Sequence, residues 1–137
     1  TPRTLFPYTT LFRSMKRILI IDDAATVRMY HRNILESAGY AVEEAMNGIE
    51  ALEKALPEPF DLYIVDINMP KLDGYGFLRQ LRGEDIPQAP AIMVSTETAA
   101  HDQSAAYRAG ANGYLIKPVK PAQLLTHVRL LLGEVYP

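Results

Sequence analysis

Two kinds of segment alternate along the chain. Four short runs rich in Ile, Val and Leu, and a fifth that alternates weakly, are typical of strands in a sheet with buried faces. A stretch with apolar residues at helical spacing follows each strand. The expected strands are 17–21, 41–45, 62–65, 90–95 and 113–117, and the expected helices are 24–38, 47–56, 73–82, 98–109 and 121–132. This alternation predicts an α/β fold, (βα)5, with a parallel sheet and helices on both faces.

Polar side chains stand at the ends of four of these strands. Asp22 and Asp23 follow the first strand and Asp66 the third, while Ser95 and Lys117 end the fourth and fifth. The carboxyl ends of parallel strands share one edge of the sheet, where open α/β sheets bind ligands. A buried strand end does not carry a lone charge without a partner, so we expect these side chains to meet there.

The charges in this group predict a metal. Three converging carboxylates repel one another, and the ammonium of Lys117 offsets only part of that repulsion. Mg²⁺, which binds one or two carboxylates, a carbonyl and waters, fits the remainder. An aspartate beside Mg²⁺, a lysine and a hydroxyl is well arranged to accept a phosphoryl group.

Several motifs together carry a family resemblance. They are Asp22-Asp23, Asp66-Ile-Asn-Met-Pro70, Ser95-Thr-Glu97 and Gly113-Tyr-Leu-Ile-Lys117-Pro118, in this order at strand ends. From Met15 to its last residue the chain resembles the receiver domain of two-component response regulators, and is most similar to the single-domain chemotaxis (CheY-like) type. The resemblance implies a flavodoxin-like, doubly wound sheet of five parallel strands in the order 2-1-3-4-5.

The resemblance also implies a phosphorylation site that depends on a metal. Asp66 would accept a phosphoryl group from a phosphohistidine on a sensor histidine kinase or a phosphotransfer protein. Mg²⁺, for which Mn²⁺ could substitute, would be held by Asp23, Asp66 and the backbone carbonyl of Asn68, with Asp22 assisting through water. Such a domain is not an enzyme toward other substrates, because it catalyses only its own phosphorylation and dephosphorylation.

Other matched positions would transmit and time the signal. Ser95 would hydrogen-bond the phosphoryl group, Lys117 would pair with it, and Tyr114 would be the switch aromatic, although it could also be a plain core residue. The Lys117-Pro118 peptide is expected to be cis, and the output surface for a downstream protein would be the fourth helix, fifth strand and fifth helix, about 98–132. Asn68 and Glu97 would tune hydrolysis, and this pair predicts a short-lived phosphoryl group.

Simpler interpretations and rival functions exist for the same residues. Asp23 alone could cap the first helix, Asp73 with Gly74 fits a turn and cap, and the three histidines fit surface or helix-face positions. A phosphorylation-independent docking receiver is one alternative function. An aspartyl phosphatase of the haloacid-dehalogenase kind is another, but it needs a second Asp where this chain has Asn68. A flavodoxin is disfavoured because Asp22 and Asp23 would repel a flavin phosphate.

Composition narrows the class of protein further. The 137 residues, 48% hydrophobic and 22% charged, fit one domain. The absence of cysteine excludes disulfides and thiolate-bound metals. A net charge of −2 disfavours direct nucleic-acid binding, and no apolar stretch is long enough for a membrane helix. We expect a cytoplasmic monomer or weak dimer, either acting alone or as a piece of a longer regulator.

The first fourteen residues stand apart from this pattern. They show no periodicity, and residues 4–14 resemble the translation of a common DNA-sequencing adapter. We therefore expect 1–14 to be a non-native, flexible extension and 15–137 to be the receiver domain, with a native disordered arm as the alternative.

Overall fold

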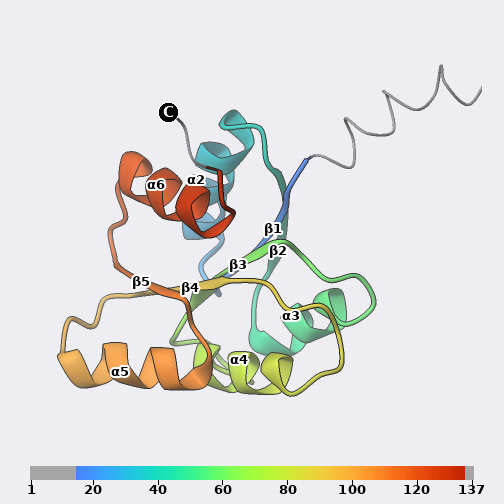
Figure 1. Ribbon diagram of the computed structural model, residues 1–137. Helices are drawn as coiled ribbons and strands as arrows, with labels where there is room; N and C mark the ends of the chain where they lie inside the picture. The colour runs from blue at the N-terminus through green and yellow to red at the C-terminus, as the bar shows by residue number, and fades with distance from the viewer. Residues whose placement is uncertain (1–14, 135–137) are drawn as a thin grey trace, which may run out of the picture.

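The computed structural model describes residues 15–134 of the chain, so the predicted extension over 1–14 lies outside the described residues. Labels follow Figure 1, in which the first helix is α2. The strands are β1 (Arg17–Ile21), β2 (Ala41–Ala45), β3 (Leu62–Asp66), β4 (Ala91–Ser95) and β5 (Gly113–Ile116). The helices are α2 (Ala25–Ser37), α3 (Gly48–Ala55), α4 (Gly74–Arg82), α5 (Ala100–Ala109) and α6 (Pro121–Leu131).

The five strands form one parallel sheet in the order β2-β1-β3-β4-β5, which confirms the predicted fold and strand order. Helices α2 and α6 cover one face, and α3, α4 and α5 cover the other (Figure 1). The chain starts in the middle of the sheet, moves to one edge at β2, and then crosses back over β1 to build β3, β4 and β5. That reversal makes the carboxyl ends of β1 and β3 the point where the strand order switches direction, the usual ligand position in this architecture.

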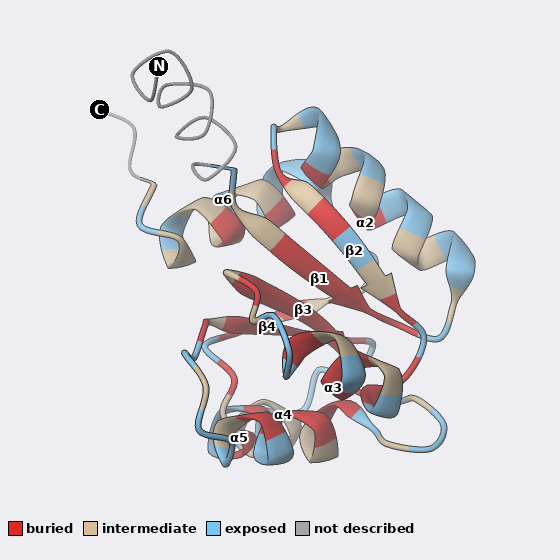
Figure 2. Cartoon of the chain, turned by 90° about the vertical axis from the view of Figure 1, so that its right-hand side faces the viewer, coloured by how far each residue is buried: buried red, intermediate tan, exposed pale blue. Residues whose placement is uncertain are grey.

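Two apolar clusters lie on the two faces of the sheet. Leu19 and Ile21 of β1 pack toward α3, α4 and α5, whereas Ile18 and Ile20 pack toward α2 and α6. All five residues of β3 are buried, as expected of a central strand covered on both faces (Figure 2). The alternation of side chains along each strand therefore divides the core into two layers.

Side chains cap two of the helices that approach the carboxyl edge of the sheet. Asp73 Oδ1 accepts a hydrogen bond from Gly76 N at 2.8 Å, which confirms the predicted cap of α4. Asn47 Oδ1 accepts one from Glu50 N at 2.9 Å and caps α3. The sequence also predicts a cap at Thr98 or a neighbour for the next helix, and this is wrong, because α5 begins after Ala99 and no side chain makes a capping hydrogen bond there.

Helix α2 buries a different stripe from the one that the sequence predicts. Helical spacing places Tyr30 on the apolar face of this helix, yet Tyr30 is 45% exposed, whereas His31, expected on the surface or a helix face, is 3% exposed. The buried Nδ1 of His31 has no hydrogen-bond partner in residues 15–134. Two stripes offset by one residue are both compatible with helical spacing, and the packing of α2 on the sheet selects the one through His31 and Leu35.

Two further side-chain placements differ from expectation. Helical spacing predicts Ile49 on the inner face of α3, but it is 43% exposed, because Ala51, Leu52 and Ala55 form the buried face instead. The sequence pattern predicts a solvated Glu44, but this side chain pairs with Arg28 and Arg32 of α2. No helix within residues 15–134 is long and apolar enough to cross a membrane.

Helix α4 begins in close contact with the end of β3. A Cβ placed on Gly74 would lie 2.4 Å from the carbonyl oxygen of Asp66 and 3.0 Å from the Cα of Ile67. Gly74 N also donates a hydrogen bond to Ile67 O at 2.8 Å, so the helix start cannot move away without losing it. Only a residue without a side chain fits this position.

The substitution Gly74→Ala is expected to lower the free energy of unfolding by about 1–3 kcal/mol, as overpacking against fixed backbone does. Chemical denaturation monitored by circular dichroism measures it. Gly83→Ala at the other end of α4 is the control, because φ there is −84° and the nearest non-neighbouring atom is 3.5 Å away. Equal stabilities of the two variants would contradict this account of Gly74.

Candidate functional site

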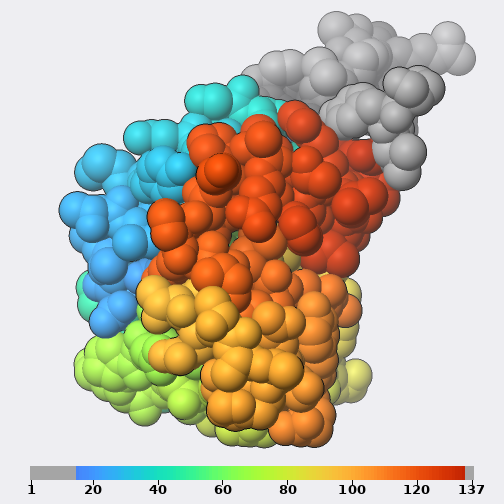
Figure 3. All heavy atoms as spheres, turned by 90° about the vertical axis from the view of Figure 1, so that its left-hand side faces the viewer, coloured from blue at the N-terminus to red at the C-terminus, as the bar shows by residue number. Residues whose placement is uncertain are grey.

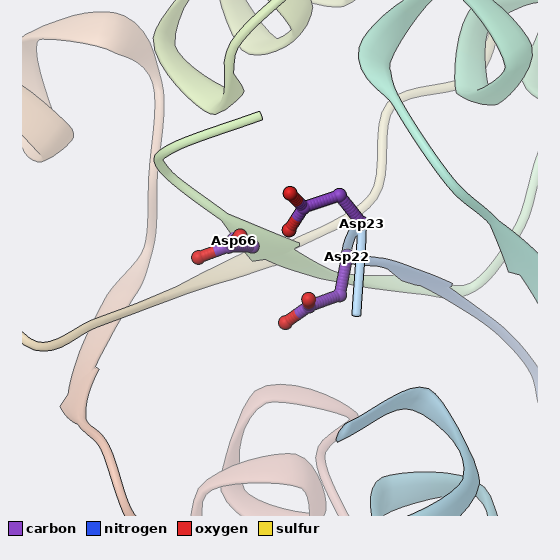
Figure 4. A group of neighbouring side chains, drawn as sticks. All are labelled: Asp22, Asp23 and Asp66. Atoms are coloured by element: carbon purple, nitrogen blue, oxygen red, sulfur yellow. The ribbon is translucent and has the colours of Figure 1, made fainter. Parts of the chain in front are cut away.

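Three carboxylates meet at the carboxyl edge of the sheet. Asp22 and Asp23 follow β1, and Asp66 ends β3, and one carboxylate oxygen from each lies within 4.8 Å of the others (Figure 4). The parallel pairing of Ile21 with Val65 explains the meeting, since it sets the next residues of the two strands side by side. Asp22 and Asp66 are 3% and 7% exposed, whereas Asp23 faces solvent.

Lys117 joins the two buried carboxylates. Its Nζ lies 3.0 Å from Asp22 Oδ2 and 3.1 Å from Asp66 Oδ1 and donates a hydrogen bond to each. The residue follows β5, and its backbone N donates to the carbonyl oxygen of Ser95 at 2.8 Å, which holds it beside the end of β4. The peptide bond between Lys117 and Pro118 is cis.

Burial and charge shift the titration of both partners. Burial, together with the charges of Asp22 and Asp23, raises the pKa of Asp66 from 3.8 to about 6, although Lys117 opposes this rise. Burial alone would lower the pKa of Lys117, but its hydrogen bonds to Asp22 and Asp66 and their charges outweigh that effect and raise it. Near neutral pH, Lys117 is therefore charged and Asp66 is an anion at a free-energy cost.

The donor set suits a divalent cation. Three carboxylates face one ammonium, so two negative charges remain uncompensated, and all the side-chain donors are oxygens. Oxygen ligands and a double charge match the preference of Mg²⁺. Asp23 and Asn68 are both exposed, so the cluster opens to solvent on the side of the loop after β3.

Ser95 and Tyr114 meet through the segment after β4. Ser95 is 1% exposed, and its Oγ accepts a hydrogen bond from the backbone N of Glu97 at 3.0 Å. The hydroxyl of Tyr114, which is partly buried on β5, donates to the carbonyl oxygen of Glu97 at 2.8 Å. The backbone of Glu97 is therefore hydrogen-bonded both to the hydroxyl of Ser95 and to the hydroxyl of Tyr114 on the neighbouring strand.

Arg28 is a residue near the site that was not predicted from the sequence. Its Nη1 donates to the carbonyl oxygen of Asp22 at 2.7 Å, and its Nε donates to Glu44 Oε1 at 2.8 Å, so it ties the acidic loop to the edge strand β2. Asp22 Oδ1 in turn accepts a hydrogen bond from Ala24 N at 2.9 Å, and α2 has no side-chain cap, which leaves Asp23 free of the capping role considered above. The sequence did offer one signal for this role, because Arg28 is a cationic residue near the start of the helix that follows Asp22 and Asp23.

The family model of the response regulator receiver domain matches residues 18–129. The chain belongs to this family. Its fold and the acidic cluster with Lys117 at the edge of the sheet agree with that assignment.

Individual proteins show the same relationship. The chain is 35% identical over 116 residues to the transcriptional regulatory protein ResD of Bacillus subtilis, covering 85% of this chain and 48% of that protein. It is 35% identical to the chain in the solved structure of the Vibrio cholerae chemotaxis protein CheY4, with a TM-score of 0.82. The match covers 86% of this chain and 99% of that chain. The solved receiver domain of sensor histidine kinase PA1611 from Pseudomonas aeruginosa is 29% identical, with a TM-score of 0.81. That match covers 88% of this chain and 99% of the other. The chain thus spans about half the length of the curated relative ResD.

The raised pKa of Asp66 predicts a stability that depends on pH. The folded state favours the protonated carboxyl, so stability falls as pH rises from about 4 to about 6, and the penalty is fully present above that range. In metal-free buffer at pH 7.5, Asp66→Asn is expected to be more stable than the wild type by about 1–3 kcal/mol, because it removes the buried charge. The gain should vanish near pH 4.

Urea denaturation between pH 4 and pH 8 measures this difference. Asp85→Asn, which changes an exposed carboxylate outside the cluster, is the control and should show no such trend. A stability difference between Asp66→Asn and wild type that does not change with pH would show that the charge of Asp66 carries no penalty.

Proposed function

We propose that the protein is a phosphorylation-activated signalling switch in which Asp66 accepts a phosphoryl group from the phosphohistidine of a sensor histidine kinase or phosphotransfer protein. The observation that carries the proposal is the bridge from Lys117 to Asp22 and Asp66 within a cluster of three carboxylates. A nucleophile, a cation and a metal-binding set of oxygens are then together at one edge of the sheet.

Asp23, Asp66 and the backbone carbonyl of Asn68 are the proposed ligands of Mg²⁺, with Asp22 assisting. The similar receiver domain of PA1611 was solved with a magnesium ion coordinated in its active-site cleft. The bound ion would neutralise charge on the oxygens of the transferring phosphoryl group. Mn²⁺, which also prefers oxygen ligands, could take the same place.

The transfer step uses the charges already present. An oxygen of Asp66 forms a bond to phosphorus while the P–N bond of the donor phosphohistidine breaks, and the electron pair of that bond returns to the imidazole. Lys117 then exchanges its contact with Asp66 for one with a phosphoryl oxygen, and the hydroxyl of Ser95 donates to another. Hydrolysis by water later returns Asp66 to the free carboxylate and releases phosphate.

The link from Ser95 to Tyr114 supports an output through α5, β5 and α6. A rotation of the Ser95 hydroxyl toward the phosphoryl group would break its bond with Glu97 N, and Glu97 O also holds the hydroxyl of Tyr114. The new position of this segment would change the surface that a downstream protein contacts. Both a chemotaxis protein and a transcriptional regulator are among the similar proteins, so the similarity supports a receiver in either kind of pathway.

The rival functions differ in what becomes of the phosphoryl group. A haloacid-dehalogenase-type phosphatase needs a second acid two residues after its nucleophile, and Asn68 stands there. A docking receiver would bind its partner without phosphorylation. Under our proposal the chain is not an enzyme toward other substrates, and it catalyses only its own phosphorylation and dephosphorylation.

Incubation with a small acyl phosphate and Mg²⁺ is expected to add one phosphoryl group to the intact protein, detected by mass spectrometry. The group should be absent in Asp66→Asn and without divalent metal, because the nucleophile or the charge neutralisation is then missing. Asp73→Asn, outside the carboxylate cluster, is the control and should be phosphorylated. No gain in mass under any condition would leave the docking receiver, and turnover of phosphate esters without accumulation on Asp66 would indicate the phosphatase.

The phosphoryl group is expected to be short-lived, with loss in Mg²⁺ buffer complete well within hours. Asn68 and Glu97, which are both exposed near the site, leave room for the hydrolytic water. Release of phosphate after removal of the donor measures the rate, and Asn68→Arg should slow it by covering the carboxyl phosphate. A wild-type phosphoryl group that persists for hours would contradict this prediction.

A further inference from the structure

The loop between β5 and α6 carries Lys117 at its start and contacts α2 through one tyrosine. The hydroxyl of Tyr30 donates a hydrogen bond at 3.0 Å to the backbone carbonyl oxygen of Val119, two residues beyond Lys117. Val119 is 2% exposed, so the bond holds a buried part of the loop. Among the described residues, it is the hydrogen bond that joins this loop to α2.

A cavity that opens to solvent lies between α2 and the loop. It has a volume of about 310 Å³, with Val27, Tyr30 and His31 on the side of α2 and Lys117, Pro118 and Val119 on the side of the loop. Figure 3 shows the blue residues of α2 beside the orange residues that follow β5. Val119 also belongs to the apolar cluster on this face of the sheet, so the Tyr30 hydrogen bond adds to the packing that holds the loop.

The two ends of the loop are held by other contacts. Lys117 N donates to Ser95 O at 2.8 Å, and Lys120 O accepts from Leu124 N at 3.0 Å in the first turn of α6. Between these anchors, the Tyr30 hydrogen bond fixes Val119 relative to α2. Helix α2 itself begins three residues after Asp22, which pairs with Lys117.

From this geometry we propose that Tyr30 is a positioning residue for phosphoryl transfer. It holds Val119, and through Val119 and Pro118 it holds Lys117 at the distance from which its ammonium reaches Asp66. The inference rests on the proposed function for its kinetic part. Its structural part, the control of the loop by the Tyr30 hydroxyl, stands in the unmodified protein.

The substitution Tyr30→Phe tests the proposal, since it removes the hydroxyl and keeps the ring that lines the cavity. Phosphorylation by a small acyl phosphate at saturating Mg²⁺ is measured over a range of donor concentrations. The saturated rate is expected to fall about three- to tenfold, the effect of one lost hydrogen bond. The half-saturating donor concentration and the affinity for Mg²⁺ should stay within about twofold of wild type, because Tyr30 contacts neither ligand set.

A second measurement needs no phosphoryl transfer. Nuclear magnetic resonance of the unmodified protein should show new exchange broadening at the amide of Val119 and a shift of the Nζ and Cε signals of Lys117 in Tyr30→Phe. Tyr107→Phe is the matched control, since Tyr107 is 51% exposed on α5 and its hydroxyl makes no hydrogen bond among the described residues. It should leave both the rate and the signals unchanged.

The outcomes separate this inference from the proposed function. A wild-type protein that takes up no phosphoryl group would refute the proposed function, and the signals of Val119 and Lys117 would then decide the role of Tyr30 alone. Unchanged signals, or an unchanged saturated rate in a wild type that is phosphorylated, would overturn the positioning role. An equal loss of rate in Tyr107→Phe would overturn it as well.

Discussion

The contact of one ammonium with two buried carboxylates is the interaction on which the site depends. Asp22 and Asp66 stand on adjacent parallel strands, so the sheet itself forces like charges together, and Lys117 reaches them from a third strand end. Without that ammonium, burial of the two carboxylates would lower the free energy of unfolding, because neither charge would have a partner. One positive charge against three carboxylates still leaves Asp66 with a raised pKa and a cluster that favours cations. The buried charge of Asp66 therefore lowers stability locally, and strongly shifted pKa values of this kind are common at functional sites.

Two polar contacts connect the site with the rest of the molecule on either side of Lys117. On the side of β4, Glu97 bonds both Ser95 and Tyr114 and links the site to the surface of α5 and β5. On the side of α2, the hydroxyl of Tyr30 bonds the carbonyl oxygen of Val119, and both residues line an open cavity. Both tyrosine hydroxyls donate to backbone carbonyl oxygens in loops, and Ser95 accepts from a backbone N–H, so small movements of these loops are enough to make or break the bonds.

The sequence by itself determined the elements, their parallel arrangement and the residues at the carboxyl edge. Apolar runs that end in charges are a local signal, and chain direction in a βα repeat places all these ends together. What local pattern could not supply was the rotation of each helix about its axis. Tyr30 and His31 exchanged their expected environments, and Glu44 became an ion-pair partner of α2.

Only the tertiary structure decided which side chains support the site. Arg28 and Tyr30 donate hydrogen bonds to the backbone carbonyl oxygens of Asp22 and Val119. Every residue has such an oxygen, so the sequence does not indicate which residue accepts the bond. The candidate residues could be identified from the sequence because charged and hydroxyl side chains directly follow or end apolar strands. Their supports could not, because contacts that depend on helix rotation and loop path are set by the packing of the whole chain.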